Sequence, residues 1–226
     1  MPKNATSTVM MYYGNPSAPD KRDGNNVFPD FFDDFSDGTY AAGPRPWTVN
    51  AGTYSVAGTD KYLNNVSADA ISSPSTKAYG TWEFDWYKGN TANNLAVNFI
   101  NPTGVSGYYF NPYVDENIYF FKYNSVTEND LFITVAPYIA NNTWYRTKIT
   151  RTTAGVFTAY IKGGAFGSAN WTEVVEISGS NPTVADNTYG RDCTRFFKSG
   201  AHLILGRAVR NTADIELACC HVGLLN

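Results

Sequence analysis

The chain has 226 residues, of which 15% are aromatic and only 16% charged, and its formal net charge is −3. This charge shows no basic footprint for DNA or RNA, and no apolar run approaches the roughly 20 residues of a membrane span. Nucleic-acid binding and membrane insertion are therefore both disfavoured. The length fits one large all-β domain, and the many aromatic residues indicate a sizeable core with aromatic surface left over.

Residues 1–30 predict one strand followed by a linker. Thr8–Tyr13 has the composition of a strand, and the Gly, Asn, Pro and Asp residues after it are typical of turns. We expect this strand to pair with an edge strand, because an unpaired apolar strand is an association hazard. The first four residues lack the apolar core of a signal peptide, so either the protein is not secreted by that route or the sequence begins downstream of a signal.

The same N-terminal region resembles part of another protein class. The stretch from Ser7 to Phe35 reads STVMMYYGNPSAPDKRDGNNVFPDFFDDF. It resembles the C-terminal end of an uncharacterised β-domain found in repetitive microbial and archaeal surface proteins. The resemblance implies that Met1 stands inside a longer ancestral protein. We divide the chain into a lead-in at residues 1–30 and a main domain at residues 31–226.

The main domain predicts strands separated by turn residues, without any sustained helical period. The strongest local signal is a β-hairpin with Gly155 at the turn position that requires a positive φ. Turns recur at the spacing typical of sandwiches. The predicted strands are Trp47–Val56, Thr81–Gly89, Asn94–Ile100, Gly107–Tyr113, Asn117–Tyr123, Leu131–Ala136, Thr143–Arg151, Val156–Lys162, Trp171–Ile177, His202–Gly206 and Asp214–Val222.

Two of these strands alternate apolar and polar residues, which assigns their side chains to faces. In the strand at Thr81–Gly89, one face carries Trp82, Phe84 and Trp86, and the other carries Glu83, Asp85 and Tyr87. In the first arm of the hairpin, Trp144, Arg146 and Lys148 share the face opposite Tyr145, Thr147 and Ile149. We expect the side chains of the apolar faces to lie in the core and those of the polar faces to lie at the surface.

The order of motifs from Phe31 to Asn226 resembles a known superfamily. The motifs are FDDF, WTVNAGTYSV, WEFD, YYF and WYRTKITRTTAGVFTAYI, followed by a closing apolar strand. This order is similar to that of the concanavalin A-like lectin/glucanase superfamily, especially its laminin-G-like members. The resemblance implies an all-β jelly-roll sandwich of two curved antiparallel sheets, whose concave face or loop rim binds glycans.

The resemblance also raises the question of catalysis. Glu83 and Asp85 match the start of the carboxylate motif of family 16 glycoside hydrolases, but Tyr87 or Lys88 stands where that family has its last Glu. Retaining hydrolysis needs a second carboxyl group about 5–5.5 Å from the nucleophile. A lyase or triad mechanism would need a suitably placed histidine, and the chain has only His202 and His221. The sequence therefore favours a binding domain over an enzyme.

Four aspartates are candidates for a structural Ca²⁺, which prefers six to eight oxygen ligands. Asp33, Asp34 and Asp37 lie where several families of this superfamily hold such an ion, and Asp214 is the expected partner from a late strand. The alternative is that these residues cap turns, as aspartate readily does. The cysteines, Cys193, Cys219 and Cys220, lack a zinc spacing and leave both a bridge and free thiols open.

We expect a non-catalytic domain that binds a polysaccharide or a glycoprotein glycan outside the cell, on a cell surface or on a virion. Aromatic faces would stack on sugar rings, and polar side chains would orient the hydroxyl groups. Two alternatives stay open: a self-associating structural module of a surface layer, filament or virion, and a carbohydrate-active enzyme with an unrecognised site. The predicted ligand contacts are Glu83, Asp85, Tyr87, Trp144, Arg146 and Lys148.

Overall fold

The computed structural model describes most of the main domain. The described residues are 32–43, 46–65, 70–73, 78–90, 96–100, 106–124, 126–135, 137–174, 184–185, 204–206 and 222–223. Within them, every regular element is a strand except the short 3₁₀ helix η1, Gly164–Phe166. No helix among these residues has the length and apolarity that crossing a membrane requires. The predicted all-β class is confirmed.

The described strands form two antiparallel sheets. The first sheet has the order β1-β4-β15-β6-β7-β8-β9. Its strands are β1 (Thr48–Ala51), β4 (Ala70–Ser72), β15 (Val222–Gly223), β6 (Ala96–Ile100), β7 (Ser106–Pro112), β8 (Ile118–Asn124) and β9 (Glu128–Ile133).

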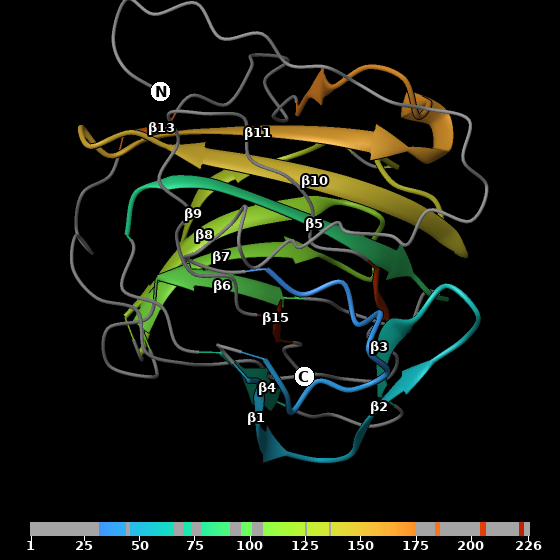
Figure 1. The fold of residues 1–226 in the computed structure, drawn as a ribbon. Coiled ribbons are helices and arrows are strands. Elements are labelled where there is room, and N and C mark those ends of the chain that lie inside the picture. The colour runs from blue at the N-terminus through green and yellow to red at the C-terminus, as the bar shows by residue number, and fades with distance from the viewer. Residues whose placement is uncertain are drawn as a thin grey trace, which may run out of the picture.

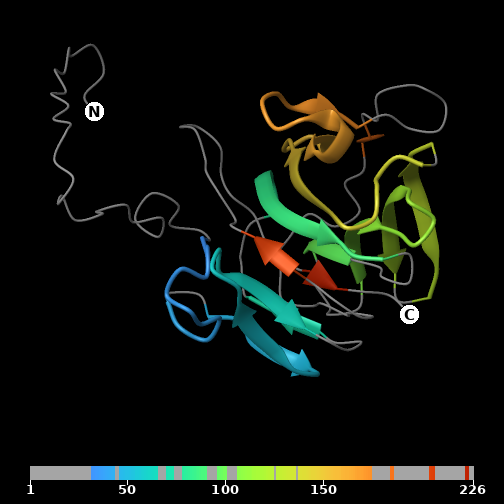
Figure 2. The same ribbon diagram turned by 90° about the vertical axis from the view of Figure 1, so that its right-hand side faces the viewer.

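The second sheet has the order β12-β11-β10-β5-β14-β3-β2, with β13 beside β11. Its strands are β12 (Thr172–Glu173), β11 (Val156–Gly163), β10 (Thr143–Arg151), β5 (Gly80–Lys88), β14 (Ile204–Gly206), β3 (Tyr62–Asn65), β2 (Tyr54–Ala57) and β13 (Val184–Ala185). The long strands β10 and β11 lie at one side of the molecule and the short strands β1 and β2 at the opposite side (Figure 1 and Figure 2).

The core lies between the two sheets and is built largely from aromatic rings. On β5, Trp82, Phe84 and Trp86 are all buried, as the alternation predicts. Phe110 of the first sheet contacts two of them edge-on, with ring centroids 5.7 Å from Phe84 and 6.1 Å from Trp86. Edge-to-face contacts of this kind add to the area that the rings bury. The jelly-roll sandwich expected from the sequence is therefore closed by aromatic packing across its layers.

The predicted hairpin is present as β10 and β11. Gly155 has a φ of 81° in its turn, which is the positive value that the sequence predicts. Gly163, at the far end of β11, has a φ of 101°, and a Cβ there would lie 2.3 Å from the carbonyl oxygen of Trp144. Both positions therefore require glycine, one for the turn and one for the close approach of two backbones.

Several element boundaries differ from the sequence prediction. Trp47–Val56 is two strands in different sheets, because the chain turns at Gly52, where φ is 79°. Residues 62–65 and 70–72 form strands that the sequence analysis does not predict. β9 begins at Glu128, three residues before the predicted start, because that residue pairs with Tyr123 of β8. The charged residues at this sheet edge disfavour pairing with another chain.

A buried hydrogen bond between strands offers a test of this core. The indole nitrogen of Trp86 donates to the hydroxyl oxygen of Thr147 at 2.9 Å, and both side chains are buried. We expect Thr147→Val to lower the free energy of unfolding by about 1–3 kcal/mol, because the indole N–H would lose its acceptor while staying buried. Urea denaturation measures this change.

The matched control is Thr48→Val on β1, where the threonine is exposed. That substitution should change the free energy of unfolding by less than about 0.5 kcal/mol. Equal stability of Thr147→Val and the wild type would show that the hydrogen bond does not support the core.

Candidate functional site

The outer face of the second sheet carries the six predicted ligand contacts. In the register of β5 and β10, Tyr87 pairs with Trp144, Asp85 with Arg146, and Glu83 with Lys148. Directly paired residues on antiparallel strands point to the same side. The alternation places the core residues of both strands on the other side, so the six predicted residues share one surface. The structure thus brings together the set that the sequence assigns to the polar faces.

Asp85 and Arg146 form a two-point ion pair in the middle of this face. Nε of Arg146 donates to Oδ1 of Asp85 at 2.5 Å, and its Nη2 donates to Oδ2 at 2.6 Å. The hydrogen bond to Asp85 raises the pKa of the Arg146 guanidinium, so this group stays charged. The side chain of Asp85 is 19% exposed and that of Arg146 is 33% exposed. This pair presents a fixed, planar set of polar atoms at the surface.

An aromatic platform lies beside the ion pair and consists of Tyr62, Tyr87 and Trp144. Trp144 is 42% exposed, although it is a large apolar side chain. Its ring centroid lies 5.5 Å from that of Tyr87 and 6.1 Å from that of Tyr62, which β3 supplies. Two neighbouring rings therefore support the indole from the side, while part of its surface stays open to solvent.

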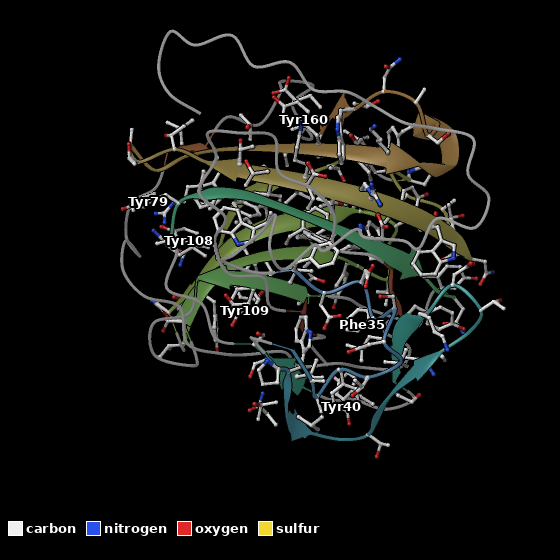
Figure 3. The ribbon with its side chains drawn as sticks, in the orientation of Figure 1. Phe35, Tyr40, Tyr79, Tyr108, Tyr109 and Tyr160 are labelled. Carbon is white, nitrogen blue, oxygen red and sulfur yellow. The ribbon has the colours of Figure 1, made fainter. Side chains whose placement is uncertain are left out.

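A lysine–aromatic cluster occupies the other end of the face and consists of Lys148, Tyr160, Lys162 and Trp171. Nζ of Lys148 lies 4.5 Å from the ring centroid of Tyr160 and 4.7 Å from that of Trp171. Nζ of Lys162 lies 4.6 Å from the centroid of Trp171. Figure 3 shows Tyr160 on the side of β11 that faces away from the first sheet. Cation–π contacts of this kind hold the ammonium groups in place.

Glu83 pairs with Lys148 of this cluster in the register, as Glu173 pairs with Tyr160. Burial raises the pKa of Glu83, and the positive charges of Lys148 and Arg146 oppose that shift. No described residue donates a hydrogen bond to it. Glu83 therefore presents acceptor oxygens that a ligand hydroxyl could use.

The carboxylates that the structure describes on this face do not form the pair that retaining glycoside hydrolysis needs. Tyr87 takes the position two residues after Asp85 on the same face, and Arg146 binds both oxygens of Asp85. Glu173 pairs with Tyr160, which places it three strands from Glu83, about 14 Å away at the usual strand spacing. The required separation is about 5–5.5 Å.

The predicted calcium ligands make turn contacts in the structure. The backbone N–H groups of Phe35, Ser36 and Thr39 donate to Oδ1 of the aspartate two residues earlier. Within the described residues, no three His, Cys, Asp or Glu side chains are grouped closely enough to hold a metal ion. The contacts agree with the turn-capping alternative, and the calcium site with Asp214 stays a prediction. The aspartates concerned are Asp33, Asp34 and Asp37.

Other predicted features lie outside the described residues. They are the strand Thr8–Tyr13, most of the strand Asp214–Val222, and the side chains of Cys193, His202, Asp214, Cys219, Cys220 and His221. The pairing of the N-terminal strand, the state of the cysteines and the division at residue 30 therefore stay predictions.

Four residues of this face are not among the ligand contacts predicted from the sequence. Tyr160 and Lys162 alternate with core residues along β11, so the same period of two that identified the contacts on β10 could have identified them. Tyr62 and Trp171 come from segments whose place beside the face depends on the folding of the whole sheet. No local pattern marks those two residues.

Comparisons with known proteins give one family match, at the N-terminus. Residues 1–50 match the family described as a domain of unknown function, DUF2341. This match is consistent with the resemblance of Ser7–Phe35 to a microbial surface-protein domain. Among curated proteins, none matches the chain.

Among solved structures, the chain is similar to the carbohydrate binding module CBM66 from Bacillus subtilis, with 17% identity, a TM-score of 0.49, and coverage of 83% of this chain and 94% of that one. A Bacillus licheniformis β-glucanase has 9% identity and a TM-score of 0.47, with 85% and 93% covered. The galectin LEC-6 from Caenorhabditis elegans has 12% identity and a TM-score of 0.36, with 70% and 94% covered. The two antiparallel sheets of the chain define the sandwich by themselves.

Asp33 provides a test through the pH dependence of stability. Its Oδ2 accepts a hydrogen bond of 2.8 Å from the indole nitrogen of Trp47. Burial raises the pKa of Asp33 from its ordinary 3.8 to about 6. Between these values the folded state binds more protons than the unfolded chain. The contribution of Asp33 to the free energy of unfolding must therefore fall as the pH rises from about 4 to about 6.

We expect Asp33→Asn to remove this contribution, so the difference in free energy of unfolding between wild type and variant should decline across that interval. Urea denaturation at a series of pH values measures it. Asp37→Asn removes a nearby negative charge that helps to raise the pKa of Asp33, so it should reduce the slope in the same direction but less than Asp33→Asn does. Parallel pH profiles for wild type and Asp33→Asn would contradict the assignment.

Proposed function

We propose that this chain is a non-catalytic carbohydrate-binding domain that binds glycan on the outer face of its second sheet. One observation carries the proposal. Trp144 is an exposed indole supported by Tyr87 and Tyr62, and it lies next to the fixed Asp85–Arg146 ion pair on the same surface. Such an aromatic platform with adjacent polar groups suits a ligand that has both apolar faces and hydroxyl groups.

The chemistry of each half of the face matches one property of a sugar. The apolar C–H face of a pyranose ring can stack on the indole of Trp144, which has a flat, polarisable surface. Its hydroxyl groups need donors and acceptors in fixed directions. Asp85 and Arg146 hold each other in one orientation, and no described residue donates a hydrogen bond to the acceptor oxygens of Glu83. Little side-chain ordering would then remain to be done on binding, which favours affinity.

The length of the face favours an oligosaccharide or a polysaccharide segment over a single sugar. Trp144 and Lys148 lie on the same face of β10, four residues apart, which corresponds to about 13 Å along a strand. Several linked sugar rings can span that length. A polysaccharide or a glycoprotein glycan is the ligand class that we propose, and such a domain would act outside the cell or on a cell or virion surface.

The charged groups of the face support binding more than catalysis. Among the described residues, Glu83 lacks a second, unoccupied carboxylate at the distance that a retaining mechanism needs, because Arg146 occupies Asp85 and Glu173 lies three strands away. The domain would therefore hold glycan without cleaving it. The competing hypothesis is a structural role in an assembly, and a binding experiment separates it from glycan binding.

The test is the binding of a panel of soluble polysaccharides, measured by affinity electrophoresis and by isothermal titration calorimetry. We expect Trp144→Ala to weaken binding about tenfold or more, because it removes the stacking surface while leaving the core untouched. The matched control is Tyr113→Ala, which removes a partly exposed aromatic ring after β7 of the first sheet. That control should bind as the wild type does.

Two outcomes would contradict the proposal. The first is equal binding by wild type and Trp144→Ala. The second is no binding to any polysaccharide together with self-association in size-exclusion chromatography, which would favour the structural role. Release of reducing sugar that disappears in Glu83→Gln would show that the face is catalytic.

A further inference from the structure

The lysine–aromatic cluster holds two ammonium groups that make no ion pair with a described residue. Lys148 contacts the rings of Tyr160 and Trp171, and Lys162 contacts Trp171 and donates a hydrogen bond of 3.1 Å to the carbonyl oxygen of Ala169. These contacts fix the positions of both ammonium groups. Most of their N–H donors remain available to a ligand, because an aromatic face attracts the charge without accepting each N–H in turn.

The register of the strands concentrates positive charge at this place. Arg146 on β10 pairs directly with Lys162 on β11, and Lys148 lies two residues from Arg146 on the same face. Like charges directly opposite each other destabilise a strand pair. Asp85 binds the guanidinium with both oxygens and so offsets one of the three charges. The ammonium groups of Lys148 and Lys162 both contact the indole of Trp171.

The remaining carboxylates of the face do not offset the lysines by contact. Glu83 pairs with Lys148 in the register, and Glu173 pairs with Tyr160. The ion pair that joins described residues of this face is that of Asp85 with Arg146. Burial raises the pKa of Glu83 in spite of the nearby lysines, so their attraction does not compensate for the loss of water around that carboxylate. The positive charges of the two lysines can therefore attract an anion from outside.

We infer that the glycan bound by this face is acidic, and that Lys148 and Lys162 bind its carboxylate or sulfate group beside Trp171. This inference rests on the proposed function and adds a substrate class to it. One sugar ring would stack on the aromatic platform, and the anionic substituent would lie about 13 Å further along β10. The platform would supply recognition of the ring, and the lysines would select for charge.

The experiment compares polymers that differ only in charge. Polygalacturonate is paired with its methyl ester to test the carboxylate, and dextran sulfate is paired with dextran to test the sulfate. Binding of the full chain is measured for the wild type, Lys148→Gln, Lys162→Gln and Trp144→Ala. Lys122→Gln on β8 of the first sheet is the matched control for loss of one positive charge.

We expect the wild type to prefer the charged polymer of at least one pair, and each lysine variant of the cluster to bind that polymer about three- to tenfold more weakly. Added salt should reduce the same preference, because it screens exposed charges. Lys122→Gln should bind as the wild type does. The pair that shows the preference identifies the substituent as a carboxylate or a sulfate.

Equal affinity for the two members of both pairs, or equal losses in Lys122→Gln and the cluster variants, would overturn the inference. The proposed function is decided separately by Trp144→Ala. Suppose that Trp144→Ala loses binding to neutral polymers while the lysine variants keep their binding to charged ones. That result would support glycan binding by the aromatic platform and would contradict an acidic ligand. If Trp144→Ala binds every polymer as the wild type does, the proposed function itself fails.

Discussion

The pairing of β5 with β10 is the constraint on which both the core and the candidate site depend. On the inner side of this pair, Trp86 stacks on Tyr145 with ring centroids 4.9 Å apart, and its indole donates to Thr147. On the outer side, Asp85 binds Arg146. A shift of one residue in this register would turn every one of these side chains to the opposite face. The aromatic core therefore fixes the register, and the register assembles the polar face.

This coupling explains why a surface with so many charged groups can be orderly. An exposed ion pair contributes only about 0–1 kcal/mol by itself, because holding two long side chains in place costs conformational entropy. Here the backbone of both partners is already fixed by buried aromatic contacts directly beneath them. The order of the face is thus supplied mainly by the core. Recognition of a ligand can use these polar groups without first having to arrange them.

The sequence predicts the parts of the site that follow from alternation within one strand. Trp82, Phe84 and Trp86 are buried and Glu83 and Asp85 face outward, because apolar residues at every second position leave only one face for the core. The two hairpin strands are predicted for the same reason. What alternation cannot supply is the pairing between distant strands. The contact of Tyr62 with Trp144 and of Trp171 with Lys148 depends on that pairing.

The strand boundaries show the same limit. Gly52 lies between two segments that each have strand composition, and only the choice of partner strand sends β1 to one sheet and β2 to the other. The aspartates Asp33 and Asp37 illustrate a different ambiguity. A carboxylate that accepts a backbone N–H in a turn and one that binds a cation need the same residue type. Only their contacts in the fold separate the two roles.

The C-terminal part of the region that matches the N-terminal family belongs to the core of the sandwich. Residues 1–50 give that match, yet Phe35 and Trp47 are 2% and 5% exposed and belong to the same buried cluster as Trp82 and Trp86. Truncating a buried aromatic residue to alanine costs about 3–5 kcal/mol, which is a large share of the roughly 5–15 kcal/mol that stabilises a whole domain. Asp33 ties this segment down further through its hydrogen bond to Trp47. Loss of Phe35 and Trp47 would therefore remove part of the core that the two sheets share.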